Sequence, residues 1–316
     1  MELLLTGGTG FFGRALLRSW SHRALLGLEV PKVTIVTRSP NMFMKNYPEF
    51  SDNFWLTLHE SNVLDYDSLP RHRLFTHVIH AATESTIGPS IPALQRYDDI
   101  VTGTRNILDY AVTNNVKRFL MTSSGGVYGP QPSELQRIPE SYLGIPDPLD
   151  SASAYSIGKR AAEHLCALYN DHFGIEAVIA RCFSFIGKDL PLTAHFAVGN
   201  FIHDALHNES IIVTGSAATV RTYMNQADLA RWLLSILEKG KAGHAYNVGS
   251  DEEITISELA NRVRVILSPQ KPVIFKPTPH SFQGRSVYVP DIGIAKNELH
   301  LDIKVSLDES ISEFLE

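Results

Sequence analysis

Apolar and polar positions follow two different rhythms along the first half of the chain. Short apolar runs rich in β-branched residues are typical of strands buried in a parallel sheet, and longer stretches with apolar residues three and four apart are typical of amphipathic helices. The runs predict strands over residues 2–6, 32–37, 76–82, 117–124 and 176–185. The longer stretches predict helices over residues 11–20, 92–114 and 154–173. This alternation predicts an α/β fold, a Rossmann-type doubly wound parallel sheet.

Beyond residue 183 the alternation loosens into shorter elements with more Pro and Gly. We therefore predict a Rossmann domain over residues 1–182 and a smaller C-terminal lobe over residues 183–316, partly interleaved with it. Residues 129–154 are rich in Pro and polar side chains and are predicted to form a long loop, and long loops in compact domains are often functional.

Composition narrows the classes of partner. The 316 residues are 44% hydrophobic, enough for a full core, and the net charge of −6 includes no basic block that would neutralise nucleic acid. No apolar run approaches the roughly 20 residues that span a bilayer. Because Met1 leads directly into the first strand, we expect a cytoplasmic protein without a membrane partner. The 2 cysteines lie in apolar surroundings and the 13 histidines lack ligand spacing, so no metal site is predicted.

A glycine-rich loop joins the first strand to the first helix. Gly8, Gly10 and Gly13 have the GxGxxG spacing of dinucleotide-binding loops. Glycine lets the backbone approach a pyrophosphate, and the helix N-terminus supplies amide groups to the anion. We predict a dinucleotide site here, a plain turn being the alternative, and the candidate cofactor-binding residues of this loop are Gly7, Gly10, Phe11, Phe12 and Gly13.

The end of the second strand bears on which dinucleotide binds. Sites specific for NAD usually place an acidic residue there, against the ribose hydroxyls. This chain has Thr37 followed by Arg38, and a guanidinium can bind a 2′-phosphate in a bidentate manner. We therefore predict NADP, with NAD still possible if Arg38 is only a solvated charge at the strand end.

Tyr155 and Lys159 stand four residues apart at the start of a predicted helix, so both project from one face. Lowering the pKa of a tyrosine by about 3 units requires roughly 4 kcal/mol. One ammonium about 4 Å away at an effective dielectric near 20 supplies about that much. Tyr155 and Lys159, together with Ser124, are the candidate catalytic residues; the pair alone would also fit an ordinary helix surface.

Taken together, the motifs resemble the extended short-chain dehydrogenases/reductases that act on nucleotide sugars. The resemblance covers nearly the whole chain and is carried by "TGGTGFFG", "HAATES", "TGTRNIL", "SSGGVYG", "YSIGK", "RTYMNQADLA", "YNVGS" and "VYVPDIGIAKNEL". It implies further cofactor contacts at Asn62, Val63, Ala81 and Ala82. It also implies a nucleoside-diphosphate sugar as substrate, bound by Thr83, Ser85, Ser124, Gly125, Ser184, Arg221 and Arg285.

The same resemblance implies roles and departures. Ser124 would hydrogen-bond the sugar oxygen at the carbon that exchanges hydride, and Ser184 replaces the usual Asn of the family. In the 4,6-dehydratases an Asp and a Glu follow the catalytic hydroxyl, whereas this chain has Gly125 and Gly126, which cannot titrate. The resemblance also implies a homodimer formed through the helices near 92–114 and 154–173.

Several reactions remain open. NADP preference favours reduction of a nucleotide-linked 4-keto-6-deoxyhexose, because NADPH is the usual biosynthetic reductant. A 4-epimerase with retained cofactor would use the same residues, and a dehydratase is disfavoured by the two glycines. A non-enzymatic NADP sensor is a fourth alternative, but such proteins typically lose the Tyr or the Lys that this chain keeps.

Overall fold

A computed structural model describes all residues except 72–73, 84–89, 277–285 and 316. The chain forms two compact units, which we call the sheet unit and the second unit. The sheet unit comprises residues 1–127, 146–181 and 230–246; the second unit comprises residues 128–145, 182–229 and 247–316. The assignment of cofactor and substrate binding to residues 1–182 and 183–316 stays a prediction.

A seven-stranded parallel sheet with strand order β11-β6-β5-β4-β1-β2-β3 organises the fold. Its strands are β1 (Glu2–Thr6), β2 (Lys32–Thr37), β3 (Leu56–Glu60), β4 (His77–His80), β5 (Arg118–Ser124), β6 (Glu176–Cys182) and β11 (Ala245–Val248). Its helices are α1 (Phe11–Leu25), α2 (Pro40–Asn46), α3 (Ala93–Thr113), α4 (Ala154–Phe173) and α6 (Gln226–Lys239). The predicted Rossmann-type α/β class is confirmed.

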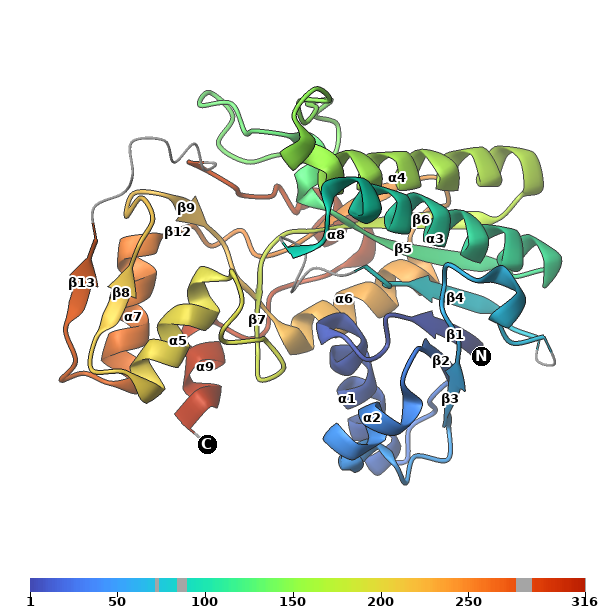
Figure 1. The fold of residues 1–316 in the computed structure, drawn as a ribbon, viewed down its shortest axis with the longest axis horizontal. Coiled ribbons are helices and arrows are strands. Elements are labelled where there is room, and N and C mark those ends of the chain that lie inside the picture. The colour runs from blue at the N-terminus through green and yellow to red at the C-terminus, as the bar shows by residue number, and fades with distance from the viewer. Residues whose placement is uncertain (72–73, 84–89, 277–285, 316) are drawn as a thin grey trace. The chain divides into compact units, whose positions relative to one another are not determined.

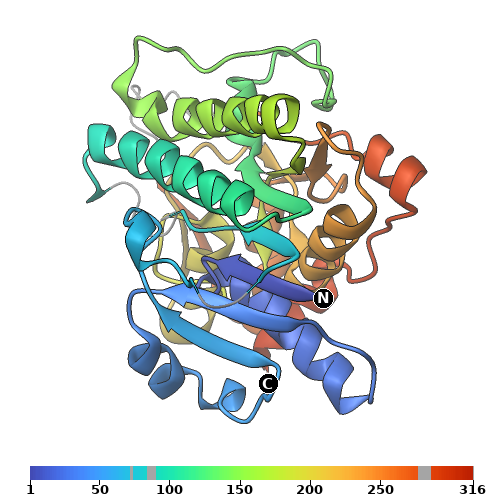
Figure 2. The same cartoon turned by 90° about the vertical axis from the view of Figure 1, so that its right-hand side faces the viewer.

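Helices cover both faces of this sheet. Figures 1 and 2 show α3 and α4 side by side on one face and α1 on the other. Leu4, Val78 and Phe119 are fully buried beneath α3 and α4, where they join Ile107 and Ala162 in one core. Continuous apolar strands are what a sheet covered on both faces requires.

The predicted elements differ from the observed ones mainly at their ends. The first helix extends beyond residue 20 to Leu25. The predicted strand over 176–185 is two strands, because β6 ends at Cys182 and Phe185–Ile186 (β7) pair instead with Met224–Asn225 (β10). Helix α4 ends at Phe173 and is capped by Gly174, whose φ of 69° is the left-handed conformation that glycine adopts without strain.

The strands that the structure describes in the second unit are short. Besides β7 with β10, β9 (Val220–Arg221) pairs with β12 (Ile254–Thr255), and β8 (Ile211–Val213) pairs with β13 (Val273–Phe275). Its further helices are α5 (Ala197–His207), α7 (Ile256–Leu267), α8 (Gly293–Leu299) and α9 (Leu307–Ser312). Among the described residues, no helix is long and apolar enough to cross a membrane.

Candidate functional site

The glycine loop begins where β1 ends and presses against the end of β4. Gly7 has a φ of 72°, and a Cβ there would lie 2.4 Å from the Ala81 carbonyl oxygen. A Cβ on Gly13 would lie 2.2 Å from the Gly8 backbone. Because side chains cannot fit at Gly7 or Gly13, the sequence keeps glycine at both, and the first turn of α1 lies close against the loop.

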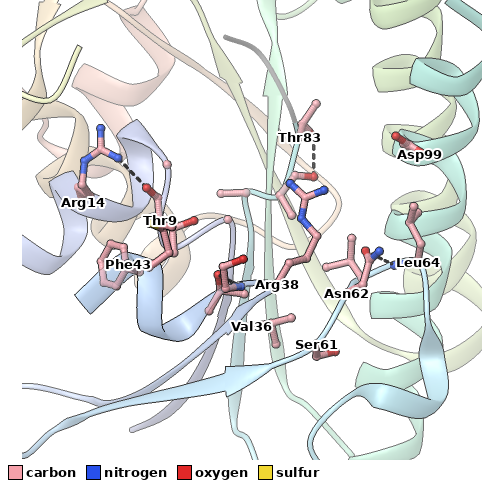
Figure 3. Close-up of a pocket in the computed structure, with 18 of the residues that line it drawn as sticks. Thr9, Arg14, Val36, Arg38, Phe43, Ser61, Asn62, Leu64, Thr83 and Asp99 are labelled. Carbon is pink, nitrogen blue, oxygen red and sulfur yellow. Dashed lines mark hydrogen bonds between the residues drawn. The ribbon is translucent and has the colours of Figure 1, made fainter. Parts of the chain in front are cut away.

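A cavity of about 490 Å³ lies in front of this loop, at the carboxyl ends of the parallel strands (Figure 3). This is where open α/β sheets bind ligands. Of the predicted cofactor residues, those that line it are Gly7, Gly10, Arg38, Asn62, Val63, Ala81 and Ala82. Thr83, predicted to contact substrate, also lines it, whereas Phe11, Phe12 and Gly13 lie beside it in α1.

Arginines give this cavity a positive character. Arg38 extends over it from the end of β2 and is exposed (Figure 3). Arg14 is buried, donates to the Thr9 carbonyl at 2.6 Å and lies 4.7 Å from the centroid of the Tyr47 ring. Sequence reasoning missed Arg14 and also Arg96, a lining residue from the first turn of α3; the position of Arg14 directly after Gly13 was an available signal.

Asn62 is held in the cavity wall by its own loop. Its Oδ1 accepts a hydrogen bond from the Leu64 backbone N–H at 3.1 Å, a local turn that follows β3 (Figure 3). Asn106 on α3 donates to the Val63 carbonyl at 2.9 Å. These two bonds place Asn62 and Val63 along one edge of the cavity.

Lys159 reaches from α4 to the cavity wall. Its buried Nζ donates to Thr83 Oγ1 at 2.8 Å and to the Thr122 carbonyl at 2.8 Å. Tyr155 lies one turn earlier on α4, with its ring centroid 6.0 Å from that Nζ. The two predicted catalytic residues of α4 therefore lie together at the strand ends, and Lys159 connects to the cavity through Thr83.

Ser124 is the last residue of β5. Its Oγ accepts the Gly126 backbone N–H at 3.0 Å, which leaves the hydroxyl proton of Ser124 for another acceptor. A Cβ on Gly126 would lie 3.2 Å from Ser124 Oγ and 2.7 Å from Ser156 Oγ. The two hydroxyls thus occupy the space into which a side chain at position 126 would project.

Partly or fully buried polar side chains form hydrogen bonds between α4 and the sheet and within the sheet's neighbouring elements. Glu163, one turn after Lys159, accepts hydrogen bonds from Ser123 Oγ at 2.5 Å and Arg181 at 2.8 Å. His80 is fully buried and bonded to Thr6 Oγ1 at 2.8 Å and Thr104 Oγ1 at 3.1 Å. Burial, and then the charge of Lys159, lowers the pKa of His80 to about 3, so its imidazole is neutral at physiological pH.

Of the other predicted substrate residues, Gly125 directly follows Ser124 in the sheet unit, whereas the rest belong to the second unit or lie outside the described residues. Ser184 is half-buried, and its carbonyl accepts the Met224 N–H at 3.0 Å. Arg221 donates to the Val220 carbonyl at 2.8 Å and lies 5.9 Å from the Tyr288 ring centroid. Ser85 and Arg285 fall outside the described residues. Within the described part of the chain, no three His, Cys, Asp or Glu side chains gather as metal ligands.

Comparison with known proteins agrees with this architecture. The model of the NAD dependent epimerase/dehydratase family matches residues 3–249. UDP-glucuronic acid decarboxylase 1 of Arabidopsis thaliana is 29% identical, over 98% of this chain and 68% of that protein. UDP-glucuronic acid decarboxylase 1 of Danio rerio is 27% identical, over 100% of this chain and 72% of that protein.

Solved structures share the fold. UDP-glucose 4-epimerase of Thermotoga maritima, solved with UDP-glucose, has a TM-score of 0.83 at 23% identity, over 100% of this chain and 97% of that chain. UDP-glucuronic acid 4-epimerase of Bacillus cereus, solved with UDP-glucuronic acid and NAD, has a TM-score of 0.83 at 22% identity, over 99% and 98%.

Proposed function

Because the chain belongs to the NAD dependent epimerase/dehydratase family, we propose that it is a nucleotide-sugar oxidoreductase that reduces a nucleotide-linked 4-keto-6-deoxyhexose with NADPH. The observation that carries the proposal is the connection of Lys159 through Thr83 to a cavity in front of a glycine loop, with Tyr155 one turn away. In this proposal the fold, the glycine loop and the Tyr155–Lys159 pair all take part in one hydride-transfer reaction.

The residues of the cavity fit a dinucleotide. Gly7 and Gly10 line the cavity and carry no side chain, so a pyrophosphate can approach their backbone at the start of α1. Arg38 at the cavity favours a 2′-phosphate over a free hydroxyl, and this supports NADP over NAD. When bound, NADPH would supply a hydride to the sugar carbon.

The chain's own groups would handle the oxygen of that carbon. Tyr155 gives its phenolic proton to the oxygen as negative charge develops there, and Lys159 stabilises the tyrosinate that remains. Ser124 donates its hydroxyl proton to the same oxygen, since its bond with Gly126 uses the Ser124 oxygen as acceptor and not the hydroxyl proton. We assign Ser184, Arg221 and, outside the described residues, Ser85 and Arg285 to binding of the nucleoside diphosphate sugar.

The two glycines after Ser124 argue against dehydration. Removing water from neighbouring carbons needs an acid and a base, and neither Gly125 nor Gly126 can titrate. The hydroxyls of Ser124 and Ser156 already fill the space beside Gly126. A 4-epimerase is the second candidate, because it needs only Ser124, Tyr155 and Lys159 and because solved structures of the same fold include 4-epimerases.

The decisive experiment mixes the protein with NADPH and a panel of UDP-, dTDP-, CDP- and GDP-linked 4-keto-6-deoxy sugars, intact hexoses and UDP-glucuronic acid. NADPH absorbance and product NMR are followed together. Loss of one NADPH per keto-sugar supports the reductase. Interconversion of epimers, or release of CO₂ from UDP-glucuronic acid, without NADPH loss would replace it.

We also propose a homodimer formed through α3 and α4. These helices pack against each other on one face of the sheet and present a second, outer face that includes the exposed Leu94 and Leu168. One chain has a mass of 35.1 kDa, and light scattering of the purified protein should give twice that mass. A mass of a single chain would contradict the dimer. Cytoplasmic location stays a prediction from the sequence.

A further inference from the structure

A second cation lies against the ring of Tyr155. The guanidinium carbon of Arg96 is 4.4 Å from the centroid of that ring, closer than the 6.0 Å of the Lys159 Nζ. Arg96 comes from the first turn of α3, whereas Tyr155 and Lys159 come from α4. The phenol is therefore in contact with positive charge from two different helices.

Close helix packing sets this contact. Gly158, three residues after Tyr155, faces α3, where a Cβ would lie 3.3 Å from Ile100 and 3.5 Å from Tyr97. The absence of a side chain at Gly158 lets α3 approach α4 at the turn that carries Tyr155. Tyr155 also packs against the core beneath both helices, so its ring is held on one side while Arg96 covers a face.

We propose that Arg96 is a positioning residue for Tyr155, one that holds the phenol ring in place and favours its anionic form. This inference rests on the proposed function, in which Tyr155 exchanges a proton. A cation above an aromatic ring is attracted to the negative face of its π system. When the phenol loses its proton, the ring gains charge and the attraction grows, so Arg96 stabilises tyrosinate more than tyrosine.

Other charged and titratable groups surround the pair. On α3, Tyr97 adjoins Arg96, and Asp99 lines the same cavity one turn later (Figure 3). On α4, Lys159 adds a second positive charge, and Glu163 is paired with Arg181.

Beneath α4, His80 on β4 is neutral at physiological pH because burial lowers its pKa to about 3. The two cations lie against the ring of Tyr155, and His80 adds no charge to them. An arginine keeps its charge at every pH used in such assays, so the effect of Arg96 does not titrate away.

The test measures ionisation of Tyr155 directly. Protein labelled with ¹³C at the tyrosine ζ carbon is titrated by NMR, and the Tyr155 signal is assigned by its loss in Tyr155→Phe. We expect Arg96→Leu to raise the pH midpoint of Tyr155 ionisation by about one unit, and Arg96→Lys to raise it by less. Arg105→Leu, which removes an exposed positive charge from the same helix, should shift it by less than about 0.2 unit.

Kinetics supply a second readout. In the direction of reduction Tyr155 must be protonated, so the alkaline limb of the kcat/KM profile should move to higher pH in Arg96→Leu by the same amount as the NMR midpoint. An unchanged NMR midpoint in both Arg96→Leu and Arg96→Lys, or equal shifts in Arg96→Leu and Arg105→Leu, would overturn the proposal.

Two further outcomes distinguish a positioning role of Arg96 from binding of the cofactor and from failure of the proposed reaction. A weaker NADPH Kd in Arg96→Leu with no change in the midpoint would make Arg96 a cofactor ligand instead, which also overturns the proposal. The NMR titration needs no substrate. A shifted midpoint without turnover of any keto-sugar would therefore support the role of Arg96 while rejecting the proposed reaction. If Arg96→Leu fails to fold, Arg96→Lys and Arg96→Gln carry the titration.

Discussion

Each of the two units is stabilised internally by a different kind of interaction. The sheet unit rests on long parallel strands whose apolar residues, such as Leu4 and Phe119, are completely buried between helices. In the second unit the described strands have only two or three residues, and buried polar side chains form hydrogen bonds to the backbone.

Asn247 is the clearest of these polar anchors. It is fully buried, donates to the carbonyls of Ile138 and Asp291 at 2.8 and 2.9 Å, and accepts from the Tyr128 hydroxyl at 2.8 Å. Asp228 plays a similar part by accepting the backbone N–H groups of Lys304 and Val305. Long regular strands can thus be assembled by apolar burial, whereas irregular chain segments need side chains that satisfy their buried backbone groups.

The largest effect that we predict concerns chemistry in the sheet unit. Tyr155→Phe should lower kcat/KM by about 1,000-fold or more while leaving the melting temperature unchanged, because only the proton donor is lost. Tyr169→Phe is the matched control on the same helix, since its hydroxyl bonds Asp109 outside the cavity. Steady-state kinetics and thermal melts check both variants, and a fully active Tyr155→Phe would end the catalytic assignment.

The next effect concerns stability of the second unit. Asn247→Ala should lower the free energy of unfolding by about 3 kcal/mol, because it removes three buried hydrogen bonds, those to the carbonyls of Ile138 and Asp291 and that from the Tyr128 hydroxyl. Asn261→Ala, on the exposed face of α7, should change it by less than about 0.5 kcal/mol. Urea unfolding measures both, and equal losses would contradict the role of buried polar anchors.

The third prediction concerns how the free energy of unfolding depends on pH, an effect that we expect from the sheet unit. His80 in the sheet unit has a pKa of about 3 when folded and an ordinary value near 6.5 when unfolded. Between these values the unfolded chain binds a proton that the folded chain does not, so stability falls as pH drops.

One such group should cost about 2 kcal/mol between pH 7 and pH 5. His80→Gln should remove that part of the slope, as seen by urea unfolding at several pH values. His300→Gln, an exposed site in the second unit, should leave the slope intact.

The smallest effect tests the predicted preference for NADP at the edge of the cavity. Arg38→Ala should raise the Kd for NADPH by about 10-fold and leave that for NADH nearly unchanged, because only the 2′-phosphate contact is lost. Lys32→Ala, at the exposed start of the same strand, is the control for loss of a positive charge. Fluorescence titration gives the Kd of each cofactor for the unchanged protein and both variants, and equal changes for both cofactors would make Arg38 a solvated charge.

Much of the sheet unit could be predicted from local pattern. The strand over 32–37 and the helix over 154–173 agree with β2 and α4, and the family to which the motifs point is confirmed by the match over residues 3–249. Prediction failed where strand pairing decides the element, as at residues 183–185, because the apolar run continues past Cys182 while its hydrogen-bond partners change.

The α/β class, the glycine loop and the Tyr155–Lys159 pair can be identified from the amino-acid sequence alone. Each depends on spacing within a single strand, loop or helix, which a local pattern records. Only the tertiary structure decided that Lys159 bonds Thr83, that Gly126 adjoins Ser156, and that Arg96 covers the Tyr155 ring. These contacts join segments 30 or more residues apart, and no periodicity along the chain specifies which distant side chains meet.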